Sequence, residues 1–278
     1  MRPETATPDL LARIAARRRE RLGTAPGIDN VAAAGAPILI PRAEPLTAAE
    51  NPFLDALARR RGRAVIAEIK LGSPRWPAAE AQEPLAGGLA AERLAELYAA
   101  HGAAALSVVV EPDFFQGSYD LLRSCRRASG LPAIAKDFVV DARQLAWARD
   151  AGADAVLLIA ALCAPGELGA LAGRARALGL APLVETRDED DLALLAGGSW
   201  ELVGVNSRDL RSFDVDLGRA VALAPRLPAT ALKVAESGIG AAGDVARLRA
   251  AGFDAFLVGE SLLRAADPAA KLRELSGE

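Results

Sequence analysis

Residues 151–159 read AGADAVLLI, and residues 251–258 read AGFDAFLV. Each stretch begins as the end of a helix, where Gly152 or Gly252 terminates the helical pattern. After an aspartate, each continues as a short apolar run without polar alternation, which is typical of a parallel strand buried on both faces. The recurring order of helix end, glycine and buried strand predicts a chain that alternates helices with parallel strands.

Eight such runs follow one another from Ala64 onward, each succeeded by a polar turn and a helical pattern with 3.6-residue spacing. They are Ala64–Ile69, Ala103–Val109, Pro132–Ala135, Ala153–Leu158, Ala181–Val184, Leu202–Val205, Ala231–Ala235 and Asp254–Val258. Eight units without a Gly/Ser linker favour a closed barrel over an open doubly wound sheet. The length of 278 residues also suits one barrel. We therefore predict an α/β fold with a single (β/α)8 barrel, or TIM barrel, over residues 64–278.

Residues 1–63 do not fit the repeat and are predicted to form an N-terminal helical extension packed on the barrel. An amphipathic stretch, Leu10 to Leu22, and a second segment, Asn51 to Arg61, have helical patterns. We expect both helices to pack against the outside of the barrel or its N-terminal end. The run Arg17-Arg18-Arg19-Glu20-Arg21 is interpreted as a solvated helix face rather than a binding patch.

Composition excludes several classes of function. The net charge of −3 provides no global positive field for nucleic acid or an anionic membrane. Apolar runs such as Ala153 to Leu162 are too short to span a membrane, and the N-terminus is charged, so we expect a cytoplasmic protein. Cys125 and Cys163 are predicted to be free buried thiols. His101, the single histidine, is predicted to end a helix, which excludes a Ser-His-Asp or Cys-His mechanism.

Charged and polar side chains follow the predicted strands, where barrel enzymes build their active sites. These side chains belong to Glu68, Lys70, Glu111, Lys136, Glu185, Asn206, Arg208 and Glu236. A lysine beside carboxylates stays protonated and can donate a proton, while a partly desolvated glutamate can transfer protons near neutral pH. No carboxylate cluster has the spacing of a metal site. The residues predict acid–base chemistry by lysine and glutamate, without a metal or a cofactor.

Two glycine-containing segments follow the last two strands, where barrels frequently bind phosphate through backbone N–H groups. They are Glu236-Ser237-Gly238-Ile239-Gly240 and Gly259-Glu260-Ser261. The spacing Gly238, Gly240, Gly243 also matches a dinucleotide fingerprint, but that fingerprint belongs in a first βαβ unit. We therefore predict a site for a phosphorylated small molecule rather than for a nicotinamide or flavin.

Eleven segments form a recognisable set of motifs: Ile66-Ala-Glu-Ile-Lys70 with Ser73-Pro74, SVVVEPDFFQGS at 107–118, Lys136-Asp137-Phe138, Ala153–Ile159, Leu183-Val-Glu185, Gly204–Leu210, Glu236-Ser-Gly-Ile239, Val258–Leu262, and the N-terminal Leu10 to Arg21 with Asn51 to Leu57. Together they resemble one enzyme family, indole-3-glycerol phosphate synthase of tryptophan biosynthesis. The resemblance covers nearly the whole chain. It implies a carbon–carbon lyase (carboxy-lyase) that closes the indole ring of 1-(2-carboxyphenylamino)-1-deoxyribulose 5-phosphate with loss of carbon dioxide and water.

The resemblance also implies roles for single residues. Lys136 would be the general acid, Glu185 would act in the dehydration, and Lys70 and Glu68 would assist and orient. The remaining catalytic residues would be Asn206 and Glu236, and the substrate-binding residues would be Ser73, Phe115, Phe138, Arg208, Ser237, Gly238, Gly259 and Ser261. Arg208 suits the substrate carboxylate because its guanidinium is a planar fork. The two phenylalanines could stack on the aromatic ring or belong to the core.

The chain departs from the family pattern after Ser73-Pro74. The family usually continues with a small residue, a basic residue and glycine, whereas this chain has Arg75-Trp76-Pro77 and a longer loop to about Leu89. Val110 also replaces an expected threonine. The departure bears on substrate and rate rather than on the fold. It keeps two alternatives open: a paralogue acting on a related phosphorylated substrate in specialised metabolism, and a barrel that binds a phosphorylated ligand without turnover.

A sugar-phosphate isomerase of similar fold, such as phosphoribosylanthranilate isomerase, would need a Cys and an Asp at strand ends, and no predicted strand ends in Cys. We expect a monomer or weak homo-oligomer whose partner is its small-molecule substrate.

Overall fold

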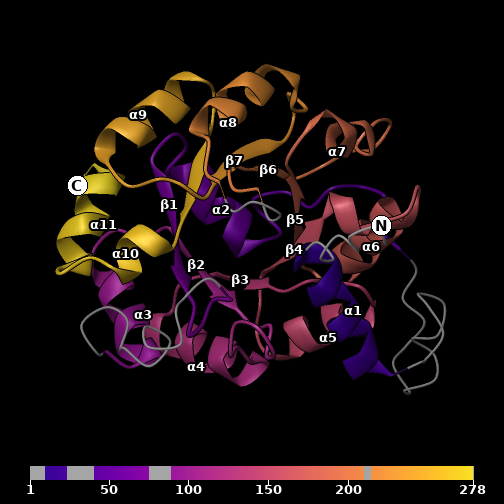
Figure 1. The fold of residues 1–278 in the computed structure, drawn as a ribbon, viewed down its shortest axis with the longest axis horizontal. Coiled ribbons are helices and arrows are strands. Elements are labelled where there is room, and N and C mark those ends of the chain that lie inside the picture. The colour runs from indigo at the N-terminus through magenta and orange to yellow at the C-terminus, as the bar shows by residue number, and fades with distance from the viewer. Residues whose placement is uncertain (1–9, 24–40, 75–88, 210–213, 278) are drawn as a thin grey trace, which may run out of the picture.

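Eight parallel strands form a closed barrel in the order in which they occur along the chain (Figure 1). The computed structural model describes residues 10–23, 41–74, 89–209 and 214–277. The strands are β1 (Ala64–Ile69), β2 (Ala105–Val109), β3 (Ala133–Lys136), β4 (Ala155–Ile159), β5 (Ala181–Thr186), β6 (Leu202–Asn206), β7 (Leu232–Glu236) and β8 (Ala255–Val258). The barrel closes where β1 pairs with β8, with Ala64 opposite Ala255. The predicted (β/α)8 barrel is confirmed.

The strands are mostly apolar because both of their faces are buried, and Glu68, Lys136, Glu185 and Glu236 lie at or near their carboxyl ends. In β1, Ile66 faces the barrel interior, whereas Val65 and Ala67 pack in the layer between the strands and the surrounding helices. Successive strand residues point to opposite faces of a sheet, so the two apolar layers require apolar residues at consecutive positions rather than an alternating pattern. This double burial explains why the strands can be recognised in the sequence.

Helices follow each strand along the chain and surround the barrel (Figure 1). They are α3 (Ala91–Ala100), α4 (Tyr119–Ser129), α5 (Arg143–Asp150), α6 (Glu167–Ala177), α7 (Glu189–Ala193), α8 (Leu217–Leu223), α9 (Ala242–Ala250), α10 (Glu260–Leu263) and α11 (Pro268–Ser276), with 3-10 turns η4 (Ala160–Leu162) and η5 (Ala224–Arg226). No helix in the described ranges is long and apolar enough to cross a membrane.

The two repeated AG-x-D stretches have the same structure. Gly152 and Gly252 have φ values of +87° and +98°, a conformation that glycine adopts without a steric penalty. The carboxylate of Asp154 accepts a hydrogen bond from the N–H of Ala133 at the start of β3. In the same way, Asp254 accepts from the N–H of Lys233 near the start of β7, and both distances are 2.9 Å. The aspartates thus satisfy backbone donors of the neighbouring strand.

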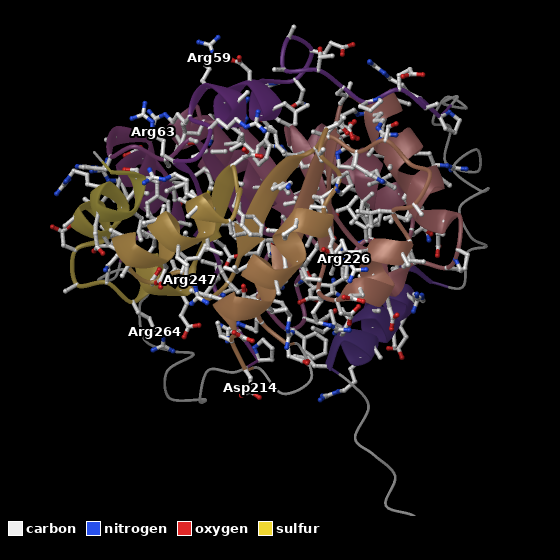
Figure 2. All side chains as sticks on the ribbon, turned by 90° about the horizontal axis from the view of Figure 1, so that it is seen from above. Arg59, Arg63, Asp214, Arg226, Arg247 and Arg264 are labelled. Atoms are coloured by element: carbon white, nitrogen blue, oxygen red, sulfur yellow. The ribbon has the colours of Figure 1, made fainter. Side chains whose placement is uncertain are left out.

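Two helices precede β1, and they lie at opposite ends of the barrel. In α2 (Pro52–Arg59), Phe53, Leu54 and Leu57 pack with the inner residues of the strands. In α1 (Leu10–Leu22), Leu10, Leu11 and Ile14 line a cavity at the carboxyl ends of the strands. Figure 2 places Arg59 and Arg63 at one end, and Asp214, Arg264 and the indigo helix α1 at the other. The expectation that both helices pack on the outside or at the N-terminal end is therefore wrong for α1.

Candidate active site

One cavity at the carboxyl ends of the strands collects most of the predicted site residues. Because the strands are parallel, residues at their carboxyl ends meet at the same mouth. The predicted residues that line the cavity are Glu68, Lys70, Ser73, Phe115, Lys136, Phe138, Glu185, Asn206, Arg208, Ser237, Gly238 and Gly259. Two predicted residues do not line it: Glu236 lies beneath Lys136, and the Ser261 hydroxyl donates to the carbonyl of Ile239.

Lys136 is held between two carboxylates in the cavity. Its Nζ lies 2.9 Å from Glu236 Oε2 and 3.5 Å from Glu185 Oε2. Burial opposes the charge of the lysine, but the carboxylates of Glu236, Glu185 and Glu68 outweigh it and raise the pKa of Lys136. The lysine therefore remains protonated at neutral pH while its side chain keeps 20% of its surface exposed. Such a group can donate a proton to a molecule in the cavity.

Glu236 is the most deeply buried carboxylate of the cluster, with 1% of its side chain exposed. Its Oε1 has no hydrogen-bond partner among the described residues. This oxygen sits where Gly204 leaves space, since a Cβ on Gly204 would lie 2.2 Å from it. Burial raises the pKa of Glu236 to about 7, and Glu185 adds to this rise while Lys136 opposes it. Near neutral pH, Glu236 can therefore hold a proton next to Lys136 and Glu185.

The raised pKa of Glu236 predicts a specific dependence of stability on pH. A carboxyl group whose pKa rises from 4.5 in the unfolded chain to about 7 in the fold binds a proton more tightly when folded. Its contribution to stability is complete below pH 4.5 and is lost as the pH rises through about 7. Glu236→Gln should therefore flatten the fall in the free energy of unfolding between about pH 5 and about pH 8.

Urea unfolding of the native chain and of Glu236→Gln at both pH values measures this effect. For each protein, the change in the free energy of unfolding between the two pH values is measured, and the two changes are then subtracted. This subtraction cancels the contributions of titrating groups that both proteins share. An equal pH dependence in the two proteins would show that Glu236 does not titrate in this range.

A second ion pair lies at the end of β1. Lys70 Nζ is 3.1 Å from Glu68 Oε1, and both side chains are largely buried. Burial disfavours the ionised form of Glu68, but Lys70 and Lys136 outweigh it and lower the pKa of this carboxyl. A Cβ on Gly259 would lie 2.3 Å from Glu68 Oε1, so glycine at this position is required by the approach of the carboxylate. This requirement holds independently of the phosphate contact predicted for Gly259.

Two aromatic rings stack beside the cavity. The rings of Phe115 and Phe138 have centroids 5.9 Å apart and planes inclined by 23°. The fully buried carboxylate of Glu111 accepts hydrogen bonds from the N–H groups of Asp113, Phe114 and Phe115, at 2.7–3.0 Å. Glu111, which the sequence groups with the other strand-end charges, therefore shapes the loop that carries Phe115 and does not line the cavity.

The segment after β7 approaches the cavity through its backbone. Ser237 and Gly238 have φ values of +67° and +77°, and a Cβ on Gly238 would lie 2.3 Å from Val215 Cγ1. Arg208 also faces this region, with its N–H donating to Asn206 Oδ1 and its Nη2 lying 2.9 Å from Glu260 Oε2. The guanidinium of Arg208, predicted to bind a substrate carboxylate, here pairs with the half-exposed carboxylate of Glu260.

Several contributors to the cavity were not predicted. The sequence predicted an amphipathic helix at α1. It did not predict that the apolar residues Leu10, Leu11 and Ile14 of this helix line the cavity. The interpretation of the arginine run as a solvated face is wrong for Arg18, which is buried and pairs with Asp137. Arg75, Trp76 and Pro77 of the departing loop lie outside the described residues.

The remaining candidate groups lie away from the cavity. Cys125 and Cys163 are free thiols, as predicted, and burial raises the pKa of each to about 12. Cys125 is buried and Cys163 is partly buried. His101 caps the end of α3, and its Nδ1 lies 2.8 Å from the carbonyl oxygen of Leu97. Within the described ranges, no group of three or more His, Cys, Asp and Glu side chains is arranged to hold a metal ion.

Sequence comparisons give one consistent family. The sequence model described as Indole-3-glycerol phosphate synthase matches residues 11–275. Proteins of that name from Albidiferax ferrireducens and Azoarcus sp. are 40% and 42% identical to this chain. These alignments cover 96% and 97% of this chain and 98% and 99% of the relatives. Indole-3-glycerol phosphate synthase 2 from Streptomyces coelicolor is 44% identical over 84% of this chain and 88% of that protein.

Solved structures of lower sequence similarity share the fold. A 3-hexulose-6-phosphate synthase from Salmonella typhimurium superposes with a TM-score of 0.59 at 15% identity, covering 77% of this chain and 97% of that chain. A thiamine phosphate pyrophosphorylase from Pyrococcus furiosus gives a TM-score of 0.55 at the same identity, covering 79% of this chain and 96% of that chain. At this identity, the likeness concerns the fold alone.

Proposed function

Since the chain belongs to the indole-3-glycerol phosphate synthase family, we propose that Lys136 and Glu185 carry the proton transfers of its reaction and that Glu236 holds Lys136 in place. The enzyme is a decarboxylating lyase of tryptophan biosynthesis. It converts 1-(2-carboxyphenylamino)-1-deoxyribulose 5-phosphate into indole-3-glycerol phosphate, carbon dioxide and water. The observation that carries the proposal is the protonated lysine held between two carboxylates in the cavity.

Lys136 acts in the ring closure. The aromatic carbon that bears the carboxylate attacks the ketone carbon, a carbon–carbon bond forms, and the ketone oxygen takes a proton to become a hydroxyl group. Lys136 can donate this proton because it is protonated at neutral pH and its ammonium group reaches the cavity. The carboxylate then leaves as carbon dioxide, and its bonding electrons restore the aromatic ring.

Glu185 acts in the dehydration. The new hydroxyl group leaves as water, which requires a proton on the departing oxygen and removal of a proton from the ring intermediate. Glu185 lines the cavity and lies 3.5 Å from Lys136 Nζ, so it can accept the proton from the ring intermediate. Lys136, reprotonated from solvent after the ring closure, donates a proton to the departing oxygen. Glu236 lies below the cavity surface and fixes Lys136 Nζ at 2.9 Å.

The other cavity residues bind and orient the substrate. The stacked rings of Phe115 and Phe138 offer an apolar surface to the anthranilate ring. Arg208 releases the carboxylate of Glu260 and binds the carboxylate of the substrate in its place. Lys70, Glu68, Asn206 and Ser73 complete the polar wall, and the backbone of Ser237, Gly238 and Gly259 holds the phosphate, with Ser261 beside it.

Turnover by the purified native chain tests the proposal. The chain is supplied with the carboxyphenylamino-deoxyribulose phosphate without added metal or nucleotide, and the indole product is followed by its fluorescence. We expect product formation, and rescue of a tryptophan auxotroph provides an independent measurement. Tight binding without product would favour the ligand-binding barrel, and neither binding nor product would favour a paralogue with another substrate. A requirement for added metal would contradict the predicted cofactor-free mechanism.

A cytoplasmic location, a monomeric or weakly oligomeric state and the absence of nucleic-acid partners remain predictions from the sequence.

A further inference from the structure

Asp137, the residue after Lys136, is the centre of a buried polar network. Its Oδ2 accepts hydrogen bonds from Arg18, from the Tyr119 hydroxyl at 2.9 Å and from Gln144 Nε2 at 2.9 Å. Its Oδ1 accepts from the N–H of Phe138 at 2.9 Å. These partners come from α1, α4, α5 and the chain that follows β3. Four contacts from different elements thus fix the peptide that carries Lys136.

Arg18 brings the N-terminal helix into this network. Its side chain is 5% exposed and forms an ion pair with Asp137, whose side chain is 2% exposed. Burial opposes the charge of the guanidinium, but the carboxylate of Asp137 outweighs it and raises the pKa of Arg18. Replacing a buried ion pair by apolar side chains is often neutral or stabilising, so the need for a stable fold does not explain this pair. A directional pair does, however, fix the relative position of two elements.

The same helix contacts the loop that carries the second aromatic ring. Arg21 Nε lies 3.0 Å from Asp113 Oδ2, and Arg17 Nε lies 3.7 Å from the same oxygen. Asp113 lies two residues before Phe115, and Asp137 lies directly before Phe138. Through these arginines α1 connects both loops that present the stacked rings, and its Leu11 and Ile14 line the same cavity.

From this arrangement, we propose that Arg18 is a positioning residue of the active site. Through Asp137 it holds the end of β3, so that Lys136 Nζ stays between Glu185 and Glu236 and reaches the ketone oxygen of the substrate. Arg18 touches neither the substrate nor Lys136 and acts on the reaction through Asp137. The proposal rests on the role of Lys136 as general acid given above.

Arg18→Met tests the proposal, with Arg176→Met as its matched control. Arg176 of α6 is also buried, and its Nε lies 2.7 Å from Glu201 Oε1 at the opposite end of the barrel, just before β6. Both variants break a buried ion pair, and Arg176→Met also removes hydrogen bonds to the carbonyls of Ala43 and Ser199, so it should lose at least as much stability. Only Arg18→Met should lower kcat, by roughly 10- to 100-fold with a much smaller change in KM, because a small displacement of a catalytic group is costly. Arg18→Lys should recover part of the loss.

A second measurement separates positioning of Lys136 from a general effect on the cavity. In the Lys136→Ala background, Arg18→Met should cause no further loss of the residual kcat, since its effect passes through the missing lysine. The same fold loss in both backgrounds, or a native kcat in Arg18→Met, would overturn the proposal. If Arg18→Met does not fold, Asp137→Asn removes the charge and keeps the size, and the same two outcomes decide.

The proposed function can fail separately. If Lys136→Ala keeps native turnover, the role of Lys136 is wrong. If Lys136→Ala is inactive and Arg18→Met retains native kcat, only the positioning role of Arg18 is wrong.

Discussion

Lys136→Ala is expected to lower kcat by roughly 10²- to 10⁴-fold and to change KM comparatively little. The variant loses the proton donor for the ketone oxygen, whereas the aromatic, carboxylate and phosphate contacts of the substrate remain. Without the ammonium group, the carboxyl of Glu236 also loses the positive charge that favours its ionised form. Neither carbon dioxide nor indole product should then form at an appreciable rate, because ring closure precedes both.

Lys233→Ala is the matched control for this variant. Lys233 lies in β7 and is partly buried like Lys136, but its Nζ donates to the carbonyl of Ala224 at 2.9 Å, away from the cavity. Its removal should reduce stability and leave kcat near the native value. Steady-state indole fluorescence over a range of substrate concentrations separates kcat from KM. Native kcat in Lys136→Ala would contradict the assignment of the general acid, and a much larger KM with native kcat would make Lys136 a binding residue.

Glu185→Gln is expected to uncouple the release of carbon dioxide from the formation of indole. The amide keeps the size of the side chain but cannot accept the proton that the dehydration requires, so indole formation should fall by roughly 10²- to 10⁴-fold. Ring closure and decarboxylation depend on Lys136, which remains. A burst of carbon dioxide close to one equivalent per enzyme should therefore precede the slow appearance of indole.

Rapid quenching with substrate labelled in the carboxylate measures the burst, and the same experiment on Lys136→Ala is the control that should show none. Equal and slow release of both products from Glu185→Gln would place Glu185 in the ring closure and contradict its assignment to the dehydration.

The sequence determined the fold and the composition of the site for physical reasons that are local. Strands such as Ala64–Ile69 and Ala155–Ile159 are recognisable because burial on both faces favours apolar residues at nearly every position. Once the strands are assigned, parallel order brings their carboxyl ends to one mouth. Lys136, Glu185 and Asn206 could therefore be grouped without coordinates.

The tertiary structure decided the partners and the protonation of these groups. Asp137 meets Arg18, 119 positions away, and Lys136 meets Glu236, 100 positions away, and neither pairing leaves a signal in the local sequence. The pKa of Glu236 depends on burial and on two charges that approach it only when the barrel closes. The local sequence pattern predicts whether a residue is buried. Desolvation and Coulomb interactions, however, depend on distances between groups across the barrel, and these distances are set only when the chain folds.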